Sequence, residues 1–406
     1  MRSARAESSR PVRVALGLAL VATLTAGCSD SYRPPAPGAT TGASPADVEA
    51  RAVRTLEELQ AALRTGDGIA AVAADDRAAS AVAAAADNVE RADIDKVSLR
   101  FLDAGGRPQE NGSWDATVEL TWRFRGYDRG VARREVTVTM AADGGTVTAL
   151  GGGEAATPLW LAQPLAVRRV PGALVLAARS TDVTALAARA RDAVDQVGAV
   201  LGGSGKMVLE APGSTGALHR ALDAPPGTYD TVAAVTAPVD GALTSDAPVH
   251  VFLNPAVYPD LDPLAAQVVI THETVHAVTR APVATAPLWL VEGFADYVAL
   301  RDVDLPYARS AGQIIDQVAA QGAPRSLPSD AALNPSADGL GAQYEAAWLA
   351  CVALADHAGE QALIDLYRAV LGGATLDEAL DQYTDWTVDD LTAAWRGRLL
   401  DLAGAR

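Results

Sequence analysis

His272 and His276 lie four residues apart in a segment whose start carries clear helix signals. Asp262 is a residue type that caps helices and Pro263 suits the first helical position, so we expect one helix over residues 263–279. Side chains four residues apart share one face of a helix. Because the chain has only five histidines in 406 residues, such a pair is rare by chance. The predicted helix therefore presents both imidazoles on one face, close enough to share a metal ion.

A carboxylate on the next predicted helix completes a metal-binding set. Pro287 opens the apolar segment LWLVEGFADYVAL, in which Glu292 and Asp296 are four residues apart and share a face. Catalytic zinc normally has three protein ligands and one open position, so we expect His272, His276 and Glu292 to bind Zn²⁺. Asp296 is expected to accept the second ring N–H of a ligand histidine, which fixes the tautomer of that ring.

Glu273 follows the first of these histidines directly, so it lies beside the metal without binding it. A carboxylate in that place can accept a proton from a metal-bound water and act as a general base. The spacing by itself therefore predicts a zinc-activated water and leaves the substrate open.

The two segments HETVH and LWLVEGFADYV together resemble the gluzincin metallopeptidases, which include thermolysin-like and aminopeptidase-like enzymes. The resemblance covers roughly residues 179–400. It implies a two-lobed domain, peptide-bond hydrolysis at zinc, Glu292 as third ligand and Glu273 as catalytic base. It also implies that Tyr344 stabilises the oxyanion, although a packing role is equally compatible with a tyrosine in this segment. The gap of 15 residues between His276 and Glu292 is shorter than in the best-known members.

Two classes of function follow from these residues. The first is an active zinc peptidase that acts on peptides or proteins, and the second is a binding or assembly module that retains the fold. The intact Glu273 favours the peptidase, because a scaffold needs no base beside its metal. No counterpart of the exopeptidase motif is present, which favours an endopeptidase. The segment VHVFLNP at 249–255 is interpreted either as an edge strand that pairs with an extended substrate or as an ordinary strand.

The N-terminus has the layout of a secretory signal peptide over residues 1–27, with four arginines followed by an apolar stretch. The sequence Thr-Ala-Gly-Cys at its end resembles a bacterial lipobox, which implies lipidation of Cys28 and anchoring to the membrane outside the cytoplasm. The usual leucine is replaced by Thr25, and a soluble secreted protein with an incidental cysteine is the alternative. Residues 28–46, rich in Pro, Gly and Ser, are predicted to form a flexible tether.

Charge and cysteine content exclude several other classes. The formal net charge of −17 argues against a nucleic-acid partner, since phosphate backbones repel acidic surfaces. With two cysteines no disulfide framework is expected, and Cys351 is interpreted as a small buried apolar residue. The histidines outside the motif, His219, His250 and His357, are interpreted as ordinary surface or packing residues. The oligomeric state is not indicated by the sequence.

The pattern of helices and strands predicts an α+β protein. Residues 47–178 are expected to form one helix followed by an antiparallel sheet, an order similar to nuclear transport factor 2-like cones, with a structural or binding role. The apolar segment at 172–178 either closes this sheet or opens the next domain. Residues 179–402 are expected to form the metallopeptidase-like domain, with a mixed sheet first and a mainly helical lobe after it.

Overall fold

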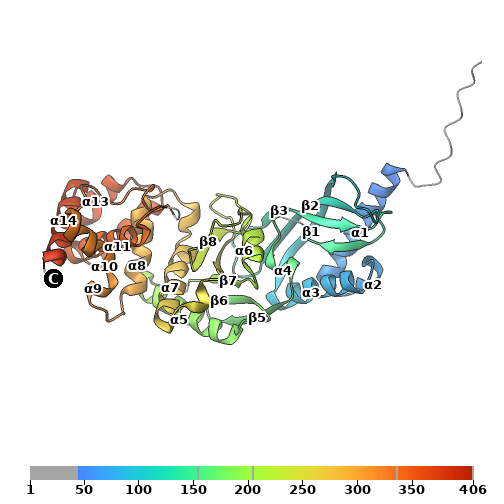
Figure 1. The fold of residues 1–406 in the computed structure, drawn as a ribbon, viewed down its shortest axis with the longest axis horizontal. Helices are drawn as coiled ribbons and strands as arrows, with labels where there is room; N and C mark the ends of the chain where they lie inside the picture. Colours follow the sequence, from blue (N-terminus) through green and yellow to red (C-terminus); the bar gives the residue numbers. More distant parts are fainter. Residues whose placement is uncertain (1–43, 153–154, 204, 335–336, 405–406) are drawn as a thin grey trace, which may run out of the picture. The chain divides into compact units, whose positions relative to one another are not determined.

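A computed structural model describes residues 44–152, 155–203, 205–334 and 337–404. The predicted signal peptide, Cys28 and nearly all of the predicted tether lie outside these residues. The described chain is α+β, as expected, with an antiparallel four-stranded sheet, a mixed five-stranded sheet and a helical C-terminal part (Figure 1). No helix among the described residues is long and apolar enough to cross a membrane.

The N-terminal part begins with a well-capped helix. Ser44 and Asp47 form a capping box at its start, and Gly66, at φ 76°, ends it in the left-handed conformation that glycine adopts without strain. Three helices, and not the single one predicted, precede the sheet, whereas the predicted order of helix first and antiparallel meander after it is confirmed. The elements are α1 (Pro45–Thr65), α2 (Ile69–Val72), α3 (Asp76–Ala92), β1 (Ile94–Gly105), β2 (Trp114–Phe124), β3 (Ala132–Met140), β4 (Val147–Leu150) and α4 (Leu159–Ala162).

The second sheet has the strand order β5-β6-β7-β9-β8. Its central strands β6, β7 and β9 run parallel and are buried throughout, as expected for a sheet covered on both faces. The outer strands β5 and β8 pair antiparallel to their neighbours. The strands are β5 (Leu165–Val170), β6 (Ala173–Ala178), β7 (Met207–Ala211), β8 (Ala234–Pro238) and β9 (Val249–Leu253).

Two interpretations are resolved by this topology. Residues 172–178 open the second sheet as β6, so the predicted boundary at residue 178 does not separate the two sheets; the change of sheet falls between β4 and β5. The segment at 249–255 forms β9, which pairs with β7 on one side and β8 on the other. The edge-strand interpretation of that segment is therefore wrong, and the strand at this edge of the sheet is β8, which pairs only with β9 among the described residues.

Helices cover the two faces of this sheet differently. On one face, α5 (Val183–Leu201) and α7 (Pro263–Thr279) pack on Val175, Leu209 and Val251. On the other face, Leu176 and Phe252 join α6 (Thr215–Leu222) and the core of the N-terminal part. The N-terminal part thus supports the sheet from the face opposite to α7.

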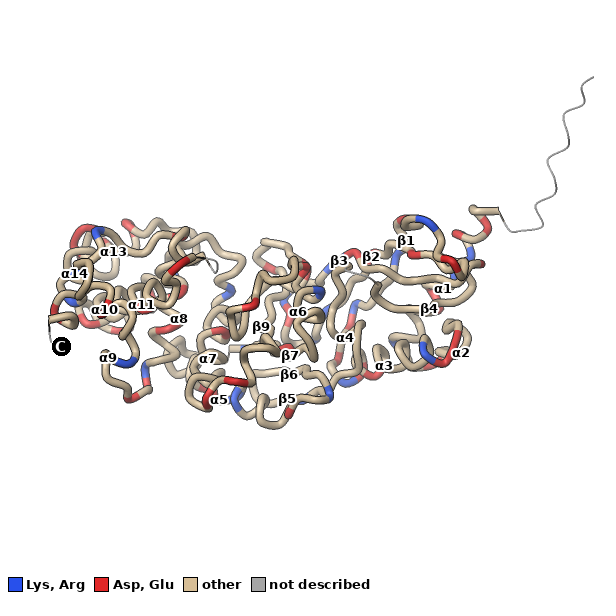
Figure 2. Tube along the Cα trace, in the orientation of Figure 1, with Lys and Arg blue, Asp and Glu red and all other residues tan. Residues whose placement is uncertain are grey.

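The C-terminal part is helical, with a core around Phe294, Tyr367 and Trp395. Its helices are α8 (Leu288–Leu300), α9 (Tyr307–Ser310), α10 (Gly312–Gln321), α11 (Leu340–Ala358), α12 (Glu360–Leu371), α13 (Leu376–Thr384) and α14 (Val388–Gly404). Two 3₁₀ turns, η1 (Tyr258–Asp260) and η2 (Ala281–Val283), precede and follow α7. Acidic and basic residues occur in every part of the described chain, so the negative charge is not confined to one part (Figure 2).

Candidate metal centre

Helix α7 has the ends that the sequence predicts. Asp262 accepts hydrogen bonds from the backbone N–H groups of Leu264 and Ala265 at 2.9 and 3.0 Å, and Pro263 occupies the first helical position. The helix ends at Thr279, and Arg280 follows in the left-handed conformation at φ 61°. These local signals hold the two histidines on one rigid, mostly buried helix.

Three ligand atoms from α7 and α8 converge. The Nε2 atoms of His272 and His276 are 2.9 Å apart, and they lie 3.1 and 3.3 Å from Oε2 of Glu292. Metal–ligand bonds of about 2.0–2.1 Å in a tetrahedron place neighbouring ligand atoms about 3.3 Å apart. The three groups therefore have the spacing that one metal ion requires, and they form a potential metal-binding cluster.

Asp296 orients the first histidine. The Nδ1–H of His272 donates to Oδ1 of Asp296 at 2.8 Å, so Nε2 is the ring nitrogen that faces the cluster, and a metal ion bound there would replace its proton. Burial alone would lower the pKa of His272, but Asp296 and Glu292 raise it well above the usual value. Burial likewise opposes the ionisation of Glu292, yet the two histidines hold the pKa of that carboxyl well below its usual range. Nδ1 of His276 is buried and has no partner in the described part of the chain.

The short gap between the second histidine and Glu292 is spanned by a compact link. Arg280 turns the chain, the 3₁₀ turn η2 follows, and Pro287 precedes the first residue of α8. Next to the ligand, Gly293 lets α8 approach α11 closely, since a Cβ atom at this position would lie 2.3 Å from the carbonyl oxygen of Ala347. This contact sets how α8 is placed and rotated against α11, and it thereby sets the position of the Glu292 side chain.

Glu273 is buried beside the ligands and is held by a neighbouring strand. The hydroxyl of Thr236, on the edge strand β8, donates to Oε2 of Glu273 at 2.5 Å. This bond orients the carboxylate, and within the part of the chain that the structure describes no hydrogen bond is donated to Oε1. Thr236 was not identified from the sequence, because a single threonine in a strand carries no signal of its own.

Tyr344 lies on α11 and belongs to the same site. Its ring centroid is 6.3 Å from that of His272, and both side chains line one cavity of about 370 Å³. Burial, and then the carboxylates Glu292 and Asp296, raise the pKa of Tyr344, so its hydroxyl stays protonated and can donate a hydrogen bond. Tyr344 also packs against the core of the helical part, so both roles considered for it are compatible with this position.

The cavity is otherwise lined mainly by apolar groups. They come from β8 and the segment before it, from the link between α7 and α8, from the start of α8 and from the connection between α10 and α11: Tyr229, Val232, Ala234, Val235, Ala281, Pro282, Ala284, Ala286, Leu288, Val291 and Leu333. The polar groups are those of the metal centre together with Thr236, so the chemistry is concentrated at one end of an apolar cleft.

The remaining predicted residues have varied roles. Cys351 is fully buried and unpaired, as expected. His357 stacks on Trp386 with centroids 3.8 Å apart, and its Nε2 lies 3.0 Å from the carbonyl oxygen of Thr384, which confirms a packing role. His219 is half-buried on α6.

His250 is not an ordinary packing residue. Its ring nitrogens lie 2.6 Å from Glu210 and 2.9 Å from Asp128, and all three side chains are buried. An imidazole that donates to two carboxylates must carry both protons. Burial would lower the pKa of His250, but Asp128 and Glu210 together raise it to about 9. The cluster joins β7 and β9 to the turn after β2.

No protein-family model matches the chain, and no curated protein matches it in sequence.

Proposed function

We propose that this protein is a zinc-dependent peptidase in which His272, His276 and Glu292 hold the metal and Glu273 is the general base. The observation that carries the proposal is the convergence of two imidazoles and a carboxylate with tetrahedral spacing, beside a second, non-ligating carboxylate in an open cleft. Two histidines and one carboxylate form a ligand set typical of catalytic zinc. The resemblance of these segments to the gluzincins supports peptide bonds as the substrate.

The residues around the cluster have separable roles. Zinc bound by the three ligands would supply an activated water and polarise the substrate carbonyl. Glu273, oriented by Thr236, accepts the proton that the attacking water loses and delivers it to the leaving nitrogen. The Tyr344 hydroxyl donates a hydrogen bond to the oxyanion that develops on the carbonyl oxygen. Asp296 keeps His272 in the tautomer that can bind metal.

The edge strand β8 supports an extended substrate. Within the described residues β8 pairs on one side only, with β9, and it borders the cleft through Val235 and Thr236. A peptide can pair with such an edge through its backbone, while the apolar wall of the cleft accepts an apolar side chain near the scissile bond. This arrangement favours cleavage within a chain over recognition of a free terminus.

Zinc content and one isosteric substitution test the proposal. Purified protein should contain one zinc ion per chain, measured by elemental mass spectrometry. Glu273→Gln should retain the zinc but cleave a peptide library at least about 100-fold more slowly. Glu90→Gln, an exposed glutamate on α3, is the matched control and should cleave normally. Protein without zinc, or cleavage unaffected by Glu273→Gln, would refute the peptidase. Zinc without any cleavage by the unaltered protein would favour the binding module.

A further inference from the structure

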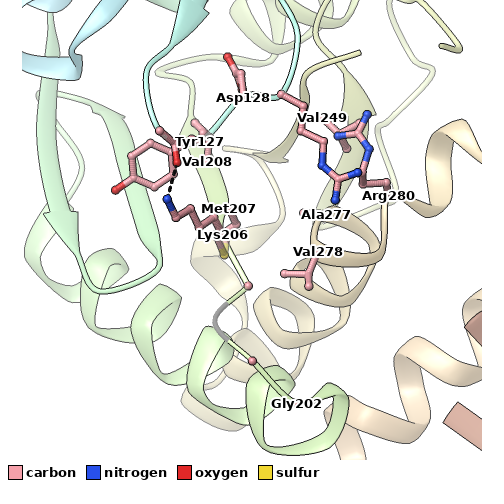
Figure 3. A pocket seen from close by; sticks show the side chains of 14 residues that line it. Tyr127, Asp128, Gly202, Lys206, Met207, Val208, Val249, Ala277, Val278 and Arg280 are labelled. Atoms are coloured by element: carbon pink, nitrogen blue, oxygen red, sulfur yellow. Dashed lines mark hydrogen bonds between the residues drawn. The ribbon is translucent and has the colours of Figure 1, made fainter. Parts of the chain in front are cut away.

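A second cavity, of about 560 Å³, lies at the C-terminal end of α7 and shares no lining residue with the metal cleft. Three segments form its wall: the turn after β2 at residues 126–129, the glycine-rich loop before β7, and the end of α7 at residues 277–280. Figure 3 shows Lys206 and Arg280 extending into this space from opposite sides, with Val278 and Gly202 at its lower end. The cavity is thus lined both by a turn of the N-terminal part and by the helix that carries the two histidine ligands.

Three cationic side chains line this cavity, and none of them forms a salt bridge within the described residues: Arg129, Lys206 and Arg280. The Lys206 ammonium donates to the carbonyl oxygen of Gly126 at 2.8 Å, which leaves two of its three N–H groups for a ligand. Lysine occurs only twice in the whole sequence, and one of the two is placed here.

The two guanidinium groups are close enough to affect each other. Burial lowers the pKa of Arg280, and the neighbouring charge of Arg129 lowers it further. Arg280 donates only to backbone carbonyls, from Nε to Ser245 at 3.1 Å and from Nη2 to Ala247 at 2.6 Å. These bonds hold the guanidinium at the C-terminus of α7, where a cation offsets the partial negative charge of the helix end.

The carboxylates near the cavity do not neutralise these cations. Both oxygens of Asp128 are occupied, since Oδ1 faces His250 at 2.9 Å and Oδ2 accepts the N–H of Phe124 at 2.7 Å. Asp246 exerts an attraction on Arg280 but forms no ion pair with it. A cavity lined by three cations and one committed carboxylate favours an anionic occupant.

Close backbone contacts fix the cavity walls. A Cβ atom on Gly130 would lie 2.5 Å from the carbonyl oxygen of Asp246, and one on Gly205 would lie 2.6 Å from Val278. The turn that carries Arg129 and the loop that carries Lys206 are therefore packed directly against their neighbours. Because the backbone of these segments is already fixed, only side chains have to become ordered when a ligand arrives.

We propose that this cavity binds a small molecule bearing a phosphate group, with Arg129, Lys206 and Arg280 as the binding residues. Guanidinium groups match phosphate oxygens with paired hydrogen bonds, and a lysine adds a compact charge, so the three together suit a doubly charged group. The volume exceeds what a bare phosphate ion fills and lies within the usual range of small-molecule sites, and Met207 and Val249 offer apolar contacts to an organic portion. The phosphate belongs either to a soluble phosphate ester or to a lipid headgroup.

Binding to metal-free protein tests the site without interference from zinc. Chelated protein carrying Cys28→Ser, so that no acyl chain contributes, is titrated with glycerol 3-phosphate and with inorganic phosphate by calorimetry. The same protein is sedimented with phosphatidylglycerol vesicles and with phosphatidylcholine vesicles. Arg129→Gln and Lys206→Gln should each weaken binding about tenfold or more. Both side chains are exposed, so we expect both variants to fold normally. An unchanged melting temperature checks this.

Arg54→Gln provides the matched control, because Arg54 is an exposed arginine on α1 that does not line the cavity. Saturable binding of glycerol 3-phosphate or of inorganic phosphate assigns a soluble ligand, and binding to the anionic vesicles alone assigns a lipid headgroup. Absence of binding to all the probes overturns the proposal. Equal binding by Arg129→Gln, Lys206→Gln and Arg54→Gln also overturns it.

Discussion

Replacing His250 with glutamine should destabilise the protein more than any other change of a histidine outside the metal centre. The substitution removes the cation between Asp128 and Glu210, whose side chains are only 3% and 6% exposed. Asp128 keeps one bond, from the N–H of Phe124, while Glu210 loses its charged partner. Removing one partner of a buried ion pair costs about 3–5 kcal/mol, because the charge left behind is uncompensated.

The pKa shift of His250 gives an independent estimate of how much the charged imidazole stabilises the fold. The rise of the His250 pKa from 6.5 to about 9 corresponds to about 3 kcal/mol at 1.36 kcal/mol per unit. Because the folded-state pKa is the higher one, this stabilisation is complete below pH 6.5 and is lost as the pH rises through about 9. For roughly 360 folded residues, an unfolding entropy of about 2.1 cal/mol/K per residue converts 3–5 kcal/mol into a fall of about 4–7 °C in melting temperature.

Thermal unfolding by circular dichroism at pH 6 and pH 9.5 measures both effects. At pH 6, His250→Gln should melt about 4–7 °C below the unaltered protein. His219→Gln, at a half-buried histidine on α6, should melt within about 1 °C of it. The difference between His250→Gln and the unaltered protein should shrink at pH 9.5. An unaltered melting temperature for His250→Gln at pH 6, or a difference that grows with pH, would refute a cationic imidazole bridge.

The metal centre and the N-terminus yield four further predictions. Glu292→Ala should abolish stoichiometric zinc binding, measured by competition with a chromogenic chelator; full retention of zinc would disprove its role as a ligand. Asp296→Ala should weaken zinc binding about 10–100-fold in the same assay, and an unchanged affinity would show that His272 needs no orienting partner. Tyr344→Phe should lower kcat about 100-fold with little change in KM; a change confined to KM would indicate a packing role only. Cys28→Ser should move the protein from the membrane pellet to the soluble fraction of its host, whereas continued pelleting would point to a different anchor.

The metal-binding cluster could be anticipated because its signals are local. The capping residue, the first-turn proline and the four-residue spacing each act within one or two helical turns, and all three occur in α7 as predicted. The position of Glu292 also followed from a short connection between consecutive helices. What the sequence does not contain is the distance between their axes, which depends on the packing of Gly293 against α11.

Contacts between distant segments could not be anticipated. Both β8 and β9 are short apolar strands, and only their pairing order decides that β8, with Thr236, borders the cleft. The His250 cluster unites residues 40 and 122 positions apart in the sequence. A histidine in an apolar strand resembles a packing residue until both of its carboxylate partners are known.

The close approach at Gly293 has a consequence for how mutations in this protein would be distributed. Even alanine at this position would have to push α8 away from the carbonyl oxygen of Ala347, and the neighbouring Glu292 would move with the helix. A genetic screen for loss of metal binding should therefore recover residue 293 together with the ligands, although glycine has no side chain with which to bind metal. In such a screen, the loss of metal binding on substitution of residue 293 would identify the contact between α8 and α11 as the one that sets the distance from Glu292 to the two histidines.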